Sequence, residues 1–234
     1  MAIFSGTGSQ TLAFLAVALS RRVQKPRGAR DLPGAILMVD EKCHTGSLAA
    51  IPALPRGNAV LLRDYHNPER HSLARGLLKL CRRQGLCLIM AAATRKDVGL
   101  ALDLGVHGLH ASEAALHAPA RIIGSLRQFP PRWILTASVH SRAALEKAAH
   151  LEFHAALLSP VFPTTSHPGR DALGPLRFSL LARSAPLPVY ALGGIHTGNV
   201  RRLGGSGAAG IAAIEGFALE GATLERVAIP PSSS

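Results

Sequence analysis

Eight short apolar runs divide this chain of 234 residues, and segments of helical pattern stand between them. Apolar runs of about four to eight residues bounded by turn residues predict strands, and continuous runs are typical of strands that helices cover. Strands that alternate with helices predict a parallel sheet, and eight of them predict an α/β fold with a single (β/α)8 TIM barrel. The predicted strands are Ala35–Val39, Ala59–Arg63, Leu86–Ala93, Gly108–Ala111, Ile134–Val139, Ala155–Val161, Val189–Leu192 and Gly210–Ile214.

The segments outside the predicted barrel are short. Residues 9–24 have helical periodicity, and a break rich in proline, glycine and arginine follows them. We therefore divide the chain into an N-terminal helix and linker (1–34), the barrel (35–229) and a tail (230–234). The N-terminal helix is an addition to the barrel, and we expect it to pack against the barrel.

The net charge of +12, from 26 Lys and Arg against 14 Asp and Glu, raises the question of an anionic partner. The arginines are scattered and no long basic run interleaves with aromatic residues, so we expect no nucleic acid. Phosphorylated small molecules explain the local basic residues, and a homo-oligomer stays an open alternative. The apolar stretch Leu12–Leu19 is too short for a membrane span and precedes its basic residues, unlike a signal peptide. We expect a cytoplasmic protein without a membrane partner.

Function in such barrels lies at the carboxyl ends of the strands. Gly193-Gly194 follows the seventh predicted strand, and Gly216 follows the eighth, after Glu215. Glycine lets backbone N–H groups approach a phosphate closely, and these two loops form the usual phosphate site of TIM barrels. The alternative for Gly193-Gly194 is an ordinary tight turn.

Three polar side chains end strands that are otherwise apolar. Arg63 ends the second predicted strand, where a guanidinium clamps a phosphate with two parallel hydrogen bonds. The alternative is an ion pair at the rim with Asp64 or Glu69. Ser138 and His140 lie two residues apart at the end of the fifth strand, and His140 is either an acid or base or a surface histidine.

The segment after the sixth strand, LSPVFPTTSHPG, turns from apolar residues to prolines, hydroxyls and a histidine. Thr164, Ser166 and His167 offer two hydroxyls and a cation to an oxyanion. The alternative is a proline-rich turn whose hydroxyls only cap neighbouring backbone groups.

These segments together resemble the thiamine phosphate synthase and thiazole tautomerase family. The most specific matches are SPVFPTTSHPG and PVYALGGI, and LLRDY, LGVHGLHAS and ASVHS stand in the right order between residues 35 and 217. Synthases of this family join a pyrimidine methyl diphosphate to a thiazole phosphate and release diphosphate. The resemblance implies that activity here, in thiamine biosynthesis.

The resemblance also implies roles for the candidate residues. It places the thiazole phosphate on Gly193-Gly194 and the loop of Gly216, and the diphosphate near Arg63, Ser138 and His167. Thr164 and Ser166 fall beside the thiazole. Catalysis would be mostly electrostatic, with Arg63, Ser138, His140 and His167 as the catalytic set.

Mg²⁺ is the cofactor that the resemblance implies, with Asp97 and Glu113 as its ligands because hard cations prefer carboxylates and phosphate oxygens. Several positions depart from the family. Leu61 and Tyr65 replace a glutamine and a lysine, and the second metal-binding aspartate falls at or near Ala115. Arg95 and Lys96 stand where they would neutralise the diphosphate directly.

Two further departures are His167 for a lysine and Glu215 for a serine. All of these departures, above all the lost carboxylates, keep two alternatives open. The first is a thiazole tautomerase, which needs a phosphate site and one acid or base, and His140 matches its histidine. The second is a paralogue that binds a phosphorylated ligand without catalysis.

Overall fold

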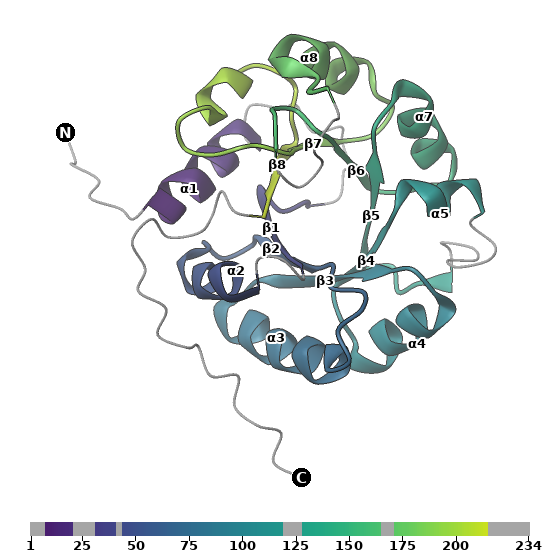
Figure 1. The fold of residues 1–234 in the computed structure, drawn as a ribbon. Coiled ribbons are helices and arrows are strands. Elements are labelled where there is room, and N and C mark those ends of the chain that lie inside the picture. Colours follow the sequence, from purple (N-terminus) through teal and green to yellow (C-terminus); the bar gives the residue numbers. More distant parts are fainter. Residues whose placement is uncertain (1–7, 21–30, 41–43, 119–127, 165–170, 215–234) are drawn as a thin grey trace.

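A computed structural model describes residues 8–20, 31–40, 44–118, 128–164 and 171–214. Within these ranges the strands run parallel and close into a barrel in chain order from β1 to β8, with β1 paired to β8 (Figure 1). The sequence prediction of a TIM barrel is confirmed. The strands are β1 (Ala35–Val39), β2 (Ala59–Leu62), β3 (Cys87–Ala92), β4 (Gly108–Ala111), β5 (Ile134–Val139), β6 (Ala155–Leu158), β7 (Val189–Leu192) and β8 (Gly210–Ala213).

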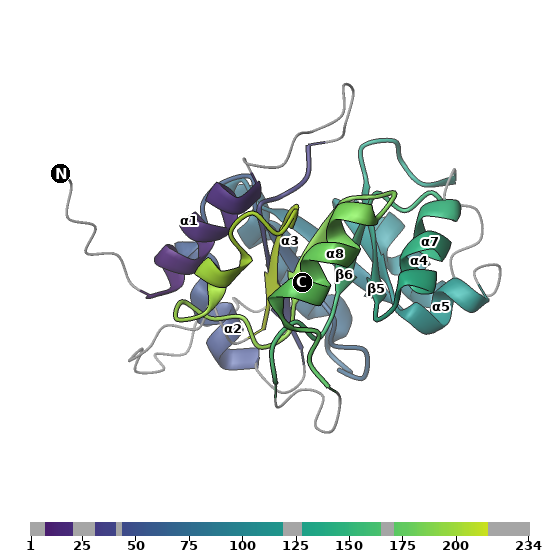
Figure 2. The ribbon, with the colours of Figure 1, turned by 90° about the horizontal axis from the view of Figure 1, so that it is seen from above.

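Helices surround the barrel on its outside (Figures 1 and 2). The sequence analysis did not predict the two helices α2 (His44–Ala50) and η1 (Ile51–Ala53) after β1, because the segment HTGSLAAIPA has no clear apolar period. The predicted helix Thr223–Val227 and the tail lie outside the described residues. The helices are α1 (Gly8–Ser20), α2 (His44–Ala50), η1 (Ile51–Ala53), α3 (Arg70–Gln84), α4 (Arg95–Leu104), α5 (Glu113–His117), α7 (Arg142–His150), α8 (Gly174–Ser184) and η3 (Val200–Leu203).

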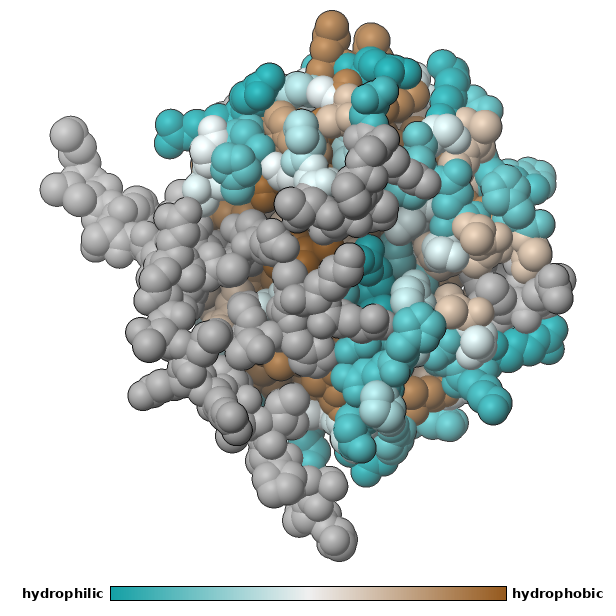
Figure 3. Space-filling view, in the orientation of Figure 1, coloured by the Kyte–Doolittle hydropathy of each residue, from teal (hydrophilic) through white to brown (hydrophobic). Residues whose placement is uncertain are grey.

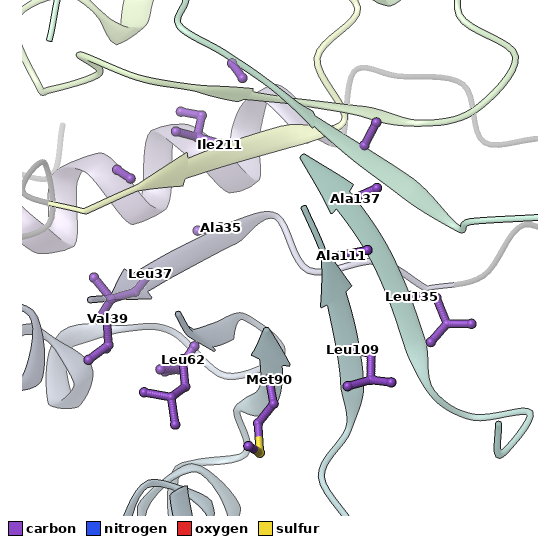
Figure 4. Packing of buried hydrophobic residues seen from close by; sticks show 14 of the residues in the cluster. Ala35, Leu37, Val39, Leu62, Met90, Leu109, Ala111, Leu135, Ala137 and Ile211 are labelled. Atoms are coloured by element: carbon purple, nitrogen blue, oxygen red, sulfur yellow. The ribbon is translucent and has the colours of Figure 1, made fainter. Parts of the chain in front are cut away.

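The pleat of the strands divides the buried apolar residues into two clusters. Leu37, Leu62, Met90 and Leu135 point away from the barrel and pack under the helices (Figure 4). The inner cluster fills the barrel itself and consists of alternate residues, among them Met38, Leu61, Ala91, Leu157 and Tyr190. Because side chains alternate across a strand, any residue two positions beyond an inner one also faces the barrel axis.

The N-terminal helix α1 packs on the outside of the barrel, against β8, β1 and η3. Leu12, Ala13 and Ala16 on this helix are fully buried. Gly34 lies so close to α1 that an added Cβ would come 3.0 Å from the Cα of Val17. The helix is therefore part of the folded unit, as the sequence predicted.

On the face seen in Figure 3, hydrophilic residues predominate along the coloured rim, and hydrophobic residues show between them. Leu176 and Leu180, one turn apart on α8, have 76% and 64% of their surface exposed. None of the described helices has the length and apolar character that crossing a membrane demands.

Candidate active site

Polar side chains that face the barrel axis gather at the carboxyl ends of β1, β2, β4 and β5. Asp40 and Arg63 lie two residues beyond Met38 and Leu61, which belong to the inner cluster. On β5, Thr136 and Ser138 face the same interior, since both contact the buried imidazole of His110 on β4. The sequence predicted Arg63 and Ser138 as neighbours of one site, and both lie close to this imidazole.

Arg63 forms its ion pair with Asp40. The sequence analysis had named Asp64 or Glu69 as the alternative partners. The Nη2 of Arg63 donates to Oδ2 of Asp40 at 2.7 Å, and its own backbone N–H donates to Val39 O. About a quarter of the Arg63 side chain is exposed, whereas the Asp40 side chain is 9% exposed. The buried carboxylate thus fixes a guanidinium whose remaining N–H groups are within reach of a ligand.

The imidazole of His110 is the functional candidate that the sequence analysis missed. It is 1% exposed, and its two nitrogens contact Thr136 Oγ1 at 2.9 Å and Ser138 Oγ at 2.8 Å. Burial, and to a lesser extent the positive charge of Arg63, lower the pKa of His110 from 6.5 to about 3. His110 is therefore neutral at physiological pH, with one donor and one acceptor nitrogen.

His140 follows the last residue of β5, two positions beyond Ser138, and contacts the loop after β6. Its Nδ1 lies 2.7 Å from Ser159 O and 3.2 Å from Ser159 Oγ. A carbonyl oxygen only accepts, so Nδ1 carries the proton and Nε2 is the basic nitrogen. This arrangement orients the ring for acid–base chemistry.

Gly193 and Gly194 form the predicted turn after β7, and both have positive φ angles of 95° and 65°. An added Cβ at Gly194 would come 2.3 Å from Pro163 O, so no other residue fits there. Asn199 holds the turn by donating from Nδ2 to Gly194 O at 2.7 Å. The turn brings backbone against the β6 loop at the mouth, and the phosphate role assigned to it stays a prediction.

The carboxylate of Asp97 is engaged by groups of its own chain. Its Oδ2 accepts from the N–H groups of Ala93 and Thr94 at 2.9 and 2.7 Å and from Thr94 Oγ1 at 2.9 Å, which forms a capping box at the start of α4. Its Oδ1 accepts from Nη1 of Arg70. To bind Mg²⁺, Asp97 would have to release some of these donors.

Glu113 differs from Asp97, because its buried Oε2 has no hydrogen-bond partner among the described residues. An orphaned carboxylate oxygen is suited to a cation. However, the described part of the chain holds no group of three or more His, Cys, Asp or Glu side chains that would bind a metal ion. The Mg²⁺ role of Asp97 and Glu113 stays a prediction, and Arg95 and Lys96 are exposed beside Asp97.

The remaining predicted residues are described only in part. Thr164 lies partly buried in the loop after β6, whereas Ser166, His167, Glu215 and Gly216 lie outside the described residues. Tyr65, which stands at the lysine position of the resemblance, packs under the guanidinium of Arg70, whose Cζ is 5.5 Å from the ring centroid. Burial raises the pKa of Tyr65, so its hydroxyl is neutral.

Known structures share this fold. Thiamine phosphate pyrophosphorylase from Pyrococcus furiosus superposes with a TM-score of 0.56 at 21% identity, over 77% of this chain and 85% of that one. The YdjI aldolase from Escherichia coli K12 superposes with a TM-score of 0.60 at 9% identity, over 88% of this chain and 80% of that one. At such identities the likeness concerns the fold alone.

Sequence relatives narrow the assignment. A thiamine-phosphate synthase from Roseiflexus castenholzii is 36% identical over 193 residues, which cover 77% of this chain and 79% of the relative. One from Chlorobium luteolum is 33% identical over 184 residues, which cover 76% and 83%. The sequence model described as thiamine monophosphate synthase matches residues 39–217. The chain therefore belongs to the thiamine monophosphate synthase family.

Proposed function

We propose that this protein joins 4-amino-2-methyl-5-pyrimidine methyl diphosphate to thiazole phosphate and releases diphosphate. The observation that carries the proposal is that Arg63, held by Asp40, and Ser138, bonded to His110, both face the mouth of a barrel of this family. In the reaction the bond between the methylene carbon and the diphosphate oxygen breaks. The thiazole nitrogen then forms a bond to that carbon, and the electron pair leaves with the diphosphate.

The side chains supply charge and position rather than covalent chemistry. Arg63, oriented by Asp40, faces the negative charge that grows on the leaving diphosphate, and Ser138 binds another of its oxygens. Gly193-Gly194 holds the thiazole phosphate across the mouth, with Thr164, Ser166 and His167 beside it. Groups that are fixed before the reaction stabilise developing charge without reorganisation. If Mg²⁺ takes part, it supplies further positive charge to the diphosphate.

The test is formation of thiamine phosphate from the two substrates, measured with Mg²⁺ and with EDTA. Product that requires Arg63, and that the exposed variant Arg142→Gln still makes, supports the proposal. The absence of product, in protein that binds thiazole phosphate, contradicts it.

The second candidate function is thiazole tautomerisation, which the geometry of His140 favours. The Nδ1–H of His140 donates to Ser159 O, so its Nε2 is the nitrogen that would move a proton on the thiazole ring. Isomerisation of a thiazole carboxylate phosphate that His140→Asn abolishes, in protein without synthase activity, would establish this function instead.

A further inference from the structure

Three side chains form a continuous hydrogen-bonded row inside the barrel. Thr136 and Ser138 on β5 contact the two nitrogens of His110 on β4, at 2.9 and 2.8 Å. Thr136 and His110 are each 1% exposed, and Ser138 lies above them toward the mouth. Whatever binds to Ser138 therefore competes with His110 for the proton and lone pairs of its hydroxyl.

The hydroxyl of Thr136 decides the tautomer of His110, because it donates either to Leu109 O or to the ring. In the arrangement of the unliganded protein, Thr136 Oγ1 donates its single proton to Leu109 O, at 3.5 Å. The Thr136 oxygen can then only accept from His110, so the ring carries its proton on Nδ1. Nε2 is consequently an acceptor, and Ser138 turns its own proton inward to it. Ser138 presents lone pairs, and no proton, to the mouth.

A phosphate oxygen is an acceptor and needs the opposite arrangement. If Thr136 turns its proton to Nδ1, the ring carries its proton on Nε2 and donates to Ser138 Oγ. The hydroxyl of Ser138 is then released to donate toward the mouth. Both arrangements hold one proton on each hydroxyl and one on the ring, which exchanges its proton with water. The change gives up only the 3.5 Å bond to Leu109 O, which is at the long limit for a hydrogen bond.

Protonation of the His110 ring would also turn Nε2 into a donor to Ser138 Oγ. The surroundings of His110 oppose this, since burial and the charge of Arg63 both hold its pKa far below its usual range. Asp40, which neutralises part of that charge, is paired to Arg63 and not to the ring. A neutral ring that exchanges one tautomer for the other is the remaining arrangement.

We propose that His110 is a positioning residue, which passes from its Nδ1–H to its Nε2–H tautomer when a phosphate anion binds at Ser138. The inference deepens the proposed function, on which it rests for the anion at this site. His110 would set the direction in which Ser138 donates, so that the hydroxyl is a donor only in the anion-bound protein.

The test uses the full chain with ¹⁵N-labelled histidine and inorganic pyrophosphate as the probe. Two-bond ¹H–¹⁵N spectra distinguish protonated from unprotonated ring nitrogens, and the variant His110→Gln identifies the signal of His110 by its loss. We expect the Nδ1–H pattern without pyrophosphate and the Nε2–H pattern at saturation. His107 and His154 are internal controls, because each accepts a backbone N–H at Nδ1 and must keep the Nε2–H pattern throughout.

Two variants test the proposal through pyrophosphate affinity as well as through the tautomer of His110. Ser138→Ala should weaken pyrophosphate binding about tenfold, the effect of losing one hydrogen bond to a charged group, and should abolish the tautomer change. Thr136→Ser keeps the hydroxyl and should keep both. A ring that stays in one tautomer at saturation, or becomes doubly protonated, overturns the proposal. The absence of pyrophosphate binding also overturns it, whereas synthase activity is decided separately by product formation.

Discussion

The polar side chains at the two ends of the barrel have different partners. At the amino end they bind backbone groups. Asn58 accepts from the N–H of Ala35 at 2.8 Å and donates to Pro55 O at 2.9 Å. His107 and His154, each just before a strand, accept the N–H groups of Leu88 and Leu135.

At the carboxyl end two pairs of inward-facing side chains bind one another. Arg63 pairs with Asp40, and His110 pairs with Ser138. A side chain that completes a backbone hydrogen bond is fixed by the fold, whereas two side chains that bond to each other can exchange one partner for a ligand. We infer from this difference that the amino end maintains the barrel and the carboxyl end is suited to binding, in line with the general division in TIM barrels.

Asp97 is the sharpest test of this comparison, because it lies at the carboxyl end but binds backbone N–H groups. We expect Asp97→Ala to lower the free energy of unfolding by about 3–5 kcal/mol, since it leaves the buried guanidinium of Arg70 without its carboxylate. Urea unfolding measures this loss. Thr94→Ala, which removes only the capping hydroxyl, should cost about 1 kcal/mol.

The same position also tests the predicted metal role of Asp97. Asp97→Asn keeps the side-chain shape, and pyrophosphate binding is then titrated with and without Mg²⁺. If stability is retained and only the Mg²⁺-dependent binding is lost, Asp97 is a ligand and the comparison fails at this residue.

Substitution of Arg63 should affect activity more than stability, whereas substitution of Asp97 should affect mainly stability. We expect Arg63→Ala to lower kcat/KM for synthase activity by about 100- to 1,000-fold, because it removes positive charge from the leaving diphosphate. Arg63→Lys should recover little, since an ammonium lacks the fork of a guanidinium. Steady-state kinetics measure both variants, and Asp40→Asn shows how much of the effect depends on orientation. An Arg63→Ala protein with wild-type kcat/KM would remove Arg63 from the site.

Asn58 tests the amino end. Asn58 is 1% exposed, and Asn58→Ala leaves the N–H of Ala35 and the carbonyl of Pro55 without this partner. We expect a loss of about 2–4 kcal/mol in unfolding free energy: about 1–3 kcal/mol for the N–H of Ala35, and about 1 kcal/mol for Pro55 O, which keeps the backbone N–H of residue 58 at 3.4 Å. At a temperature where the variant is folded, kcat/KM should stay within about twofold. A larger loss of activity would mean that the two ends are coupled.

The sequence predicted the barrel because its apolar runs are continuous and separated by segments of helical period. It placed Arg63 and Ser138 correctly on strand ends, although the regular pairing of β2 stops one residue earlier, at Leu62. It missed His110, since in the short strand Gly108–Ala111 both faces are covered and the pattern does not show which side faces the axis. The register that sets His110 opposite Thr136 exists only once β4 and β5 pair.

The smallest expected effect is the pH dependence of stability that His110 contributes. Its pKa is lowered from 6.5 to about 3 in the folded protein, so below pH 6.5 the unfolded chain binds a proton that the folded protein does not. Stability is therefore fully present above pH 6.5 and falls as the pH falls, by about 2 kcal/mol between pH 7.5 and pH 5.0. Urea unfolding across this range measures the loss, and His110→Gln should remove it. His107, whose pKa is also lowered by burial, acts in the same direction and remains in that variant. If the variant kept the whole dependence, the acid sensitivity would belong to the amino end alone.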